Sequence, residues 1–185
     1  MKSKIEYSNE SFESFIFDRN WVEPPLLYNN KGKVLRFDLV SKPEGESYRK
    51  IREFFDDLFT EGSYIYIVFY GANDYSWKSG KKYFKLFSLK KLFKKFYATR
   101  DDDFKDENPY IVVCKTRIEY FKIKKYFIDY LRGDQQSCMV FISRKKSSAL
   151  HFYDNRGFDF LSEDESFLCL MKNKYADYIL KETIV

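Results

Sequence analysis

The sequence is poor in the residues that build disulfide frameworks and metal sites. It contains three cysteines, one histidine, four prolines and seven glycines in 185 residues. Cys114, Cys138 and Cys169 lie 24 and 31 residues apart and form no C-x-x-C pair, which argues against a disulfide framework and against a zinc ribbon. Each cysteine stands among apolar neighbours, so we expect three free thiols that are buried as small hydrophobic side chains.

The single histidine, His151, restricts the catalytic chemistry that the chain can perform. Metal sites commonly use several histidines or paired cysteines, and hydrolytic triads place a histidine between an acid and a nucleophile. The sequence has no nucleophile elbow, no phosphate-binding glycine pattern and no H-E-x-x-H. We therefore predict a protein that is not an enzyme and uses no metal or cofactor. One alternative stays open, in which His151 acts with an acid such as Asp154 or Asp159.

Long hydrophobic runs are also absent. No apolar stretch approaches the roughly 20 residues that a spanning helix requires. The first ten residues include basic side chains but no apolar segment after them, so we expect no secretory signal and a cytoplasmic location. The length suits one domain, and no repeat or linker divides it, which predicts a single domain over residues 1–185.

Hydrophobic periodicity predicts the order of helices and strands. Apolar residues at helical spacing indicate helices near residues 8–18, 48–62, 89–96, 120–131 and 165–179. Alternating or β-branched segments indicate strands near residues 34–40, 63–71, 110–118, 138–143, 149–154 and 158–161. An S-x-x-E capping box at Ser162–Glu165 marks the start of the last helix. The pattern predicts an α+β fold with a single mixed or antiparallel sheet and helices packed on it.

The formal net charge of +5 is unevenly distributed. The segment from Lys78 to Arg100 holds nine cations, no acid and several aromatic residues. Such a segment can bind single-stranded nucleic acid through phosphate contacts and base stacking, but it also fits the solvated face of the helix expected over 89–96. The lysines that would carry nucleic acid binding are Lys78, Lys81, Lys82, Lys85, Lys90, Lys91, Lys94 and Lys95.

Residues 154–157 have the composition of a tight turn between two strands. Asp154 and Gly157 suit the first and fourth positions of a type I turn, with Gly157 in a left-handed bulge conformation. We expect Arg156 at the tip to pair with a nearby carboxylate such as Asp159.

Several short motifs resemble those of one family of uncharacterised bacterial proteins. His151-Phe-Tyr-Asp-Asn-Arg-Gly157 is similar to that family's H-x-Y-D-x-R-G-like hairpin, and Lys174-Tyr-Ala-Asp-Tyr-Ile179 to its last aromatic and acidic stretch. Pro25-Leu-Leu-Tyr28 and Val34-Leu-Arg-Phe-Asp-Leu39 resemble its N-terminal motifs. The resemblance spans residues 22–182 and brings no established activity. It implies a domain of unknown function associated with toxin and immunity gene islands.

From that resemblance we expect a cytosolic immunity protein that binds and neutralises a bacterial toxin, such as one of contact-dependent growth inhibition. Because the chain is basic overall, either the toxin is not a basic nuclease or the acidic segments Asp101–Glu107 and Asp154–Glu165 form the interface. Trp77, outside any helical stripe, is expected to be partly exposed and to anchor the partner, and the alternative that it fills the end of the core stays open. The residues expected to bind the partner are Tyr75, Trp77, Asp101, Asp102, Asp103, Asp106, Glu107, His151, Asp154, Arg156 and Asp159.

Overall fold

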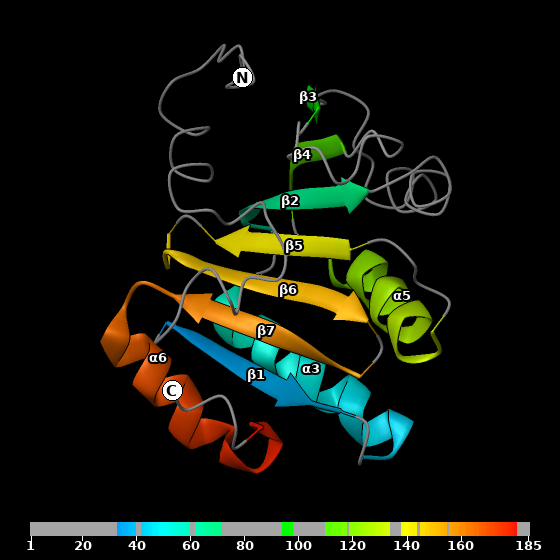
Figure 1. Cartoon of the computed structure of the whole chain (residues 1–185). Coiled ribbons are helices and arrows are strands. Elements are labelled where there is room, and N and C mark those ends of the chain that lie inside the picture. The colour runs from blue at the N-terminus through cyan, green and yellow to red at the C-terminus, as the bar shows by residue number, and fades with distance from the viewer. Residues whose placement is uncertain are drawn as a thin grey trace, which may run out of the picture.

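The computed structural model describes residues 33–39, 42–59, 62–71, 94–97, 110–117, 119–133, 138–143, 145–154 and 156–180. These residues form one seven-stranded sheet in the order β1-β7-β6-β5-β2-β4-β3, and every neighbouring pair is antiparallel (Figure 1). The predicted α+β fold with a single sheet is confirmed. The first expected helix, near residues 8–18, lies outside the described residues.

The bounds follow the sequence pattern closely for most elements. The strands are β1 (Val34–Asp38), β2 (Tyr64–Gly71), β3 (Lys94–Tyr97), β4 (Tyr110–Arg117), β5 (Cys138–Ser143), β6 (Ser148–Asp154) and β7 (Gly157–Ser162). The helices are α3 (Glu44–Leu58), α5 (Tyr120–Leu131), α6 (Glu165–Lys174) and the short 3₁₀ helix η2 (Ala176–Tyr178). None of the helices within these ranges has the length and apolar character needed to cross a membrane.

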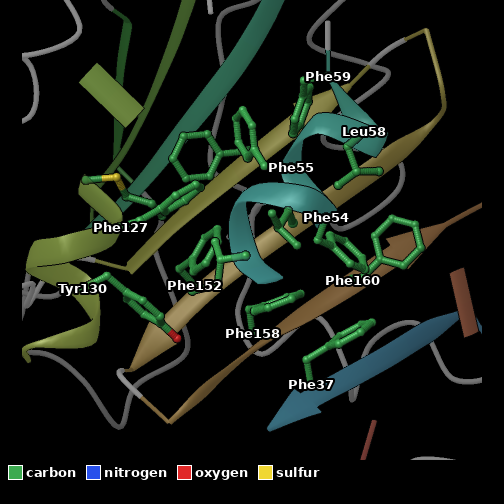
Figure 2. Close-up of a cluster of buried hydrophobic side chains, with 14 of the residues drawn as sticks. Phe37, Phe54, Phe55, Leu58, Phe59, Phe127, Tyr130, Phe152, Phe158 and Phe160 are labelled. Atoms are coloured by element: carbon green, nitrogen blue, oxygen red, sulfur yellow. The ribbon is translucent and has the colours of Figure 1, made fainter. Parts of the chain in front are cut away.

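Aromatic side chains fill the space between α3 and one face of the sheet (Figure 2). Phe37 of β1 stacks on Phe158 of β7, with ring centroids 4.6 Å apart. Phe54 of α3 contacts Phe158 and Phe160 edge to face, at 5.1 Å in each case. Alternate residues of each strand therefore supply this layer, as the period of two in a strand requires.

Helix α5 extends the same aromatic layer over the middle of the sheet. Tyr130 lies 4.9 Å from Phe152 of β6, and Phe127 lies 5.4 Å from Phe55 of α3, measured between ring centroids. Arg132, just after α5, forms an ion pair with Glu44 at the start of α3, with 3.2 Å between Nε and Oε1. The two helices thus share one core and one face of the sheet.

The helix predicted over residues 89–96 is wrong where the structure describes it. Residues Lys94–Tyr97 form β3, which pairs with β4 from Lys94 opposite Val113 to Tyr97 opposite Tyr110. A short helix gains few backbone hydrogen bonds, whereas the edge of β4 offers a partner to every second peptide group of an extended segment. Tertiary pairing therefore overrides the local helical periodicity at this position.

Two expectations about the last helix are also wrong. Its N-cap is Asp164, whose side chain accepts a hydrogen bond from the Phe167 amide at 3.0 Å, rather than Ser162. Ser162 ends β7, and its hydroxyl oxygen accepts hydrogen bonds from the Ser148 hydroxyl at 3.1 Å and from the Asp164 amide at 3.2 Å. Cys169 is exposed on α6 rather than buried, because the face of α6 that points inward is set by Met171 and not by the local apolar run.

Candidate functional site

Most of the residues predicted from the sequence to bind a partner or nucleic acid lie outside the described residues, and their roles remain predictions. They are Tyr75, Trp77, Lys78, Lys81, Lys82, Lys85, Lys90, Lys91, Asp101, Asp102, Asp103, Asp106 and Glu107. Lys94 and Lys95 lie in β3, at one end of the sheet. His151, Asp154, Arg156 and Asp159 lie on β6, β7 and the turn between them, near the opposite end.

Three polar residues form a row across neighbouring strands. The strand register places His151 of β6 opposite Asp159 of β7, and Asp159 opposite Arg36 of β1. Directly opposed residues of antiparallel strands share one face of the sheet, so the three side chains stand on the same face. This is the face opposite to Phe37, Phe158 and the helices that pack on them.

The Asp159 carboxylate is held by the Arg36 guanidinium in a two-point contact. Nε of Arg36 donates to Oδ1 of Asp159 at 2.8 Å, and Nη2 donates to Oδ2 at 3.0 Å. The Asp159 side chain is completely buried, whereas the Arg36 side chain keeps 21% of its surface exposed. A buried carboxylate requires such a partner, because an unpaired charge would lose its hydration without compensation.

His151 is also completely buried. Its two directly opposed neighbours are Asp159 on β7 and Val140 on β5. An imidazole beside a carboxylate is the pairing that an acid–base site would use, but both of these side chains are shut off from solvent. In the described structure both residues are therefore part of the protein interior.

The predicted hairpin between β6 and β7 is confirmed, but the reason for its glycine is different. β6 ends at Asp154 and β7 begins at Gly157, with a register shift between Phe152 and Asp154. Gly157 does not have a positive φ, unlike Gly62 and Gly133. A Cβ atom on Gly157 would lie 1.9 Å from the carbonyl oxygen of Phe37. Glycine is needed here because β1 approaches the backbone of β7, and the left-handed conformation that the sequence suggested is wrong.

Backbone carbonyl groups of Arg156 and Gly157 accept hydrogen bonds from neighbouring elements. The Leu39 amide donates to the carbonyl oxygen of exposed Arg156 at 2.8 Å, and the Tyr130 hydroxyl donates to the carbonyl oxygen of Gly157. The turn thus connects β1, β7 and α5. The partner of Asp159 that the structure shows is Arg36, 123 residues earlier, where the sequence suggested Arg156.

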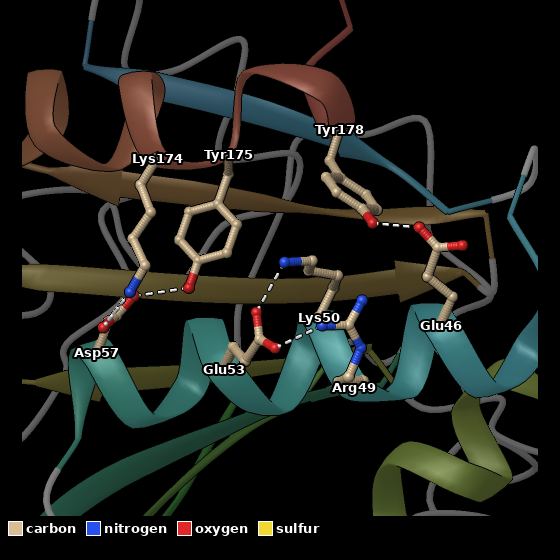
Figure 3. Close-up of polar contacts among 8 residues, drawn as sticks. All are labelled: Glu46, Arg49, Lys50, Glu53, Asp57, Lys174, Tyr175 and Tyr178. Atoms are coloured by element: carbon tan, nitrogen blue, oxygen red, sulfur yellow. Dashed lines mark hydrogen bonds and ion pairs between the residues drawn. The ribbon is translucent and has the colours of Figure 1, made fainter.

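A second group of polar residues joins α3 to the end of the chain, and we call it the α3–C-terminal cluster (Figure 3). Asp57 accepts hydrogen bonds from Lys174 Nζ at 2.6 and 2.8 Å and from the Tyr175 hydroxyl at 2.6 Å. The Tyr178 hydroxyl donates to Oε1 of Glu46. The remaining members are Arg49, Lys50 and Glu53, of which Lys50 donates to Glu53 at 2.8 Å and lies 5.7 Å from the Tyr178 ring centroid.

These contacts shift the pKa values of three members of the cluster. Burial raises the pKa of Tyr175 above its usual value, and the hydrogen bond to Asp57 raises it further. Burial and the hydrogen bond to Glu46 raise the pKa of Tyr178 to about 12. The hydrogen bond from Lys50 holds the pKa of Glu53 below its usual value. The raised pKa values keep both phenols neutral, so that each hydroxyl can donate to its carboxylate and link the C-terminal segment to α3. Within the described ranges, no group of three or more histidines, cysteines and acids is placed to hold a metal.

Sequence reasoning missed the residues that complete both groups. In the sequence Arg36 is one residue of a strand motif, and no local pattern marks Asp57 or Glu46. The motifs themselves carry a signal, because their residues make the contacts of Arg36 with Asp159, of Phe37 with Gly157 and of Tyr178 with α3. Those motifs thus describe packing between distant segments.

The comparisons with known proteins give one positive result. Searches of curated proteins and of solved structures return no match. One family model matches residues 9–183, nearly the whole chain, and its description is Domain of unknown function (DUF3885). The chain, whose motif residues make the contacts described above, therefore belongs to the DUF3885 family.

Proposed function

We propose that this protein is a cytoplasmic immunity protein that binds a bacterial toxin and neutralises it without catalysis. The observation that carries the proposal is the burial of His151 and Asp159, with Asp159 held by Arg36. His151 and Asp159, the residues that most resemble an acid–base pair, are thus closed off from solvent and from a substrate. We infer that the protein acts through its surface, as a binding module does.

The surface of the described residues offers side chains suited to binding. Tyr64 at the start of β2 is 55% exposed, and Leu170 on α6 is 58% exposed. The Arg117 guanidinium lies 5.0 Å from the centroid of the Tyr64 ring, which restrains an exposed aromatic side chain before any partner arrives. Tyrosine and arginine are enriched among the residues that dominate binding energies. Isolated exposed apolar residues are common, so this supports the proposal only together with the buried pair.

Co-expression tests the proposal directly. Each reading frame adjacent to this gene is induced in a bacterial host, alone and together with this chain, and growth is measured. We expect one neighbour to stop growth alone, to be harmless with this chain, and to elute with it as a complex. A harmless neighbour, or one that remains toxic in the presence of this chain, contradicts the proposal.

Two variants map the interface once such a partner is found. Trp77→Ala and Tyr64→Ala are each expected to weaken binding by about 2 kcal/mol if the residue is a hot spot, with little change in melting temperature. Lys124→Ala on α5 is the matched control, because Lys124 is exposed on a different element. Normal binding by both aromatic variants would place the interface elsewhere.

Nucleic acid binding is the second candidate, and the position of β3 favours it. Lys94 and Lys95 lie on β3, the last strand of the described sheet at one end, and lysines bind nucleic acid through phosphate contacts. Titration with single-stranded DNA and RNA at low and high salt discriminates the two candidates. Binding that falls steeply with salt supports this candidate, and absence of binding at low salt removes it.

A further inference from the structure

The outer edge of β1 is covered by the end of the chain. β1 is the last strand of the described sheet on its side. Ile179 forms an antiparallel bridge with Phe37, and the Leu180 amide donates to the Arg36 carbonyl oxygen at 2.9 Å. A terminal strand with unpaired backbone groups is a template for strand addition, so a covering segment of this kind protects it. We call residues 176–180 the edge cap.

The edge cap follows Tyr175, which is buried in the core, and none of its own members is buried. Tyr178 and Ile179 are half-buried against the core, whereas Ala176, Asp177 and Leu180 are exposed. Its anchors are the hydrogen bond from Tyr178 to Glu46, Lys42 at 5.2 Å from the Tyr178 ring centroid, and the backbone contacts with β1. Segments with few buried apolar contacts open at a lower free energy than the core does. The edge cap can therefore leave while the sheet remains folded.

We propose that the edge of β1 is a self-association surface, and that the edge cap competes for it with β1 of a second copy of this chain. The geometry of the existing bridge indicates the register. Because Phe37 now faces Ile179, a second β1 that takes the same place pairs Phe37 with its own counterpart. The amide of Asp38 in the second copy then reaches the Arg36 carbonyl oxygen, which is the acceptor that Leu180 now uses.

The side chains of β1 suit this two-fold register. It places Arg36 opposite Asp38 of the second copy, twice, and Leu35 opposite Leu39. Opposite charges across an antiparallel pair are favourable, and like charges are unfavourable. A two-fold interface also uses the same patch on both copies, so it closes as a dimer and does not extend into a fibre. This charge complementarity is the reason for naming a second copy as the occupant.

Replacement of one backbone donor in the full-length chain tests the competition. Leu180→Pro removes the amide that bonds to Arg36, and Ile179, with φ −88° and ψ 129°, already has a conformation that a following proline accepts. Leu180→Ala is the matched control, since it shortens the same side chain and keeps the amide. We expect Leu180→Pro combined with Tyr178→Phe to raise the dimer association constant by roughly tenfold or more in analytical ultracentrifugation, and Leu180→Ala to leave it near the starting value.

A third change tests the register itself. Adding Asp38→Lys to the double variant sets an ammonium group against the Arg36 guanidinium across the interface, and we expect the dimer to dissociate. Circular dichroism and thermal melts confirm that each variant is folded. A folded double variant that stays monomeric overturns the proposal. A dimer that survives Asp38→Lys overturns it as well, since the copies then meet elsewhere.

Discussion

The Arg36–Asp159 pair and the α3–C-terminal cluster both join segments that are distant in the sequence, but they differ in their exposure to solvent. Each joins segments more than 100 residues apart, 123 for Arg36 with Asp159 and 118 for Asp57 with Tyr175. The Asp159 side chain is completely buried, whereas the Lys174 and Asp57 side chains keep 48% and 28% of their surface exposed. Water can replace a lost partner in the cluster but not at Asp159. The buried pair therefore secures the sheet, and the cluster sets how firmly the end of the chain is docked.

The largest loss of stability is expected from a methyl group added at Gly157, where β7 lies against β1. Gly157→Ala places a Cβ atom 1.9 Å from the Phe37 carbonyl oxygen, so β1 and β7 must separate. We expect a loss of about 3 kcal/mol in the free energy of unfolding, measured by chemical denaturation. Gly45→Ala in the first turn of α3 is the control, because its Cβ meets nothing within 4 Å. Equal stability of the two variants would contradict the close approach.

Loss of the buried carboxylate is expected to have the next largest effect. Asp159→Asn keeps the shape but removes the charge that balances Arg36, which leaves a partly buried guanidinium without its ion pair. We expect a loss of about 2 to 3 kcal/mol in stability, below the upper range for fully buried pairs because Arg36 is 21% exposed. The double variant Arg36→Met with Asp159→Leu should recover part of that loss, since no isolated charge remains. A double variant less stable than Asp159→Asn would contradict this explanation.

Sequence reasoning predicted local structure better than the contacts between segments. The period of two and the period of 3.6 located most strands and helices, because those patterns record which face is buried. The same reasoning assigned residues 89–96 to a helix, since the edge of β4 that pairs with residues 94–97 is not visible in the local sequence. The Arg36–Asp159 pair was missed for the same reason. Its position depends on β1 lying beside β7, a strand order that no local pattern contains.

Tyr178→Phe measures the docking of the edge cap and should cost about 1 kcal/mol, because the lost hydrogen bond joins a neutral donor to a charged acceptor near the surface. Its pH dependence gives a sharper test. The folded pKa of Tyr178 is raised to about 12 from a usual value near 10. The contribution of Tyr178 is therefore complete below pH ~10 and is lost as the pH rises from about 10 to 12.

Comparison with the parent protein isolates that contribution, because the other tyrosines and the lysines titrate equally in both. The difference in stability between parent and Tyr178→Phe should shrink over this range, as measured by denaturation at a series of pH values. A difference that stays constant up to pH ~12 would show that the hydroxyl does not bond to Glu46. Hydrogen exchange at residues 176–180 should accelerate in the variant while β5 and β6 remain protected.

The smallest effect is expected within the exposed part of the cluster. Glu53 accepts from Lys50 at 2.8 Å and from Arg49 at 3.1 Å, but its side chain is 38% exposed. Surface ion pairs contribute about 0 to 1 kcal/mol, so Glu53→Gln should lower stability by about 0.5 kcal/mol or less. Because the pKa of Glu53 is held below its usual value, its contribution is present above that value and disappears as the pH falls. High salt should remove it at neutral pH, whereas the effect of Asp159→Asn should persist, since buried pairs are screened much less. If salt weakened both effects equally, the contrast between the buried pair and the cluster would be wrong.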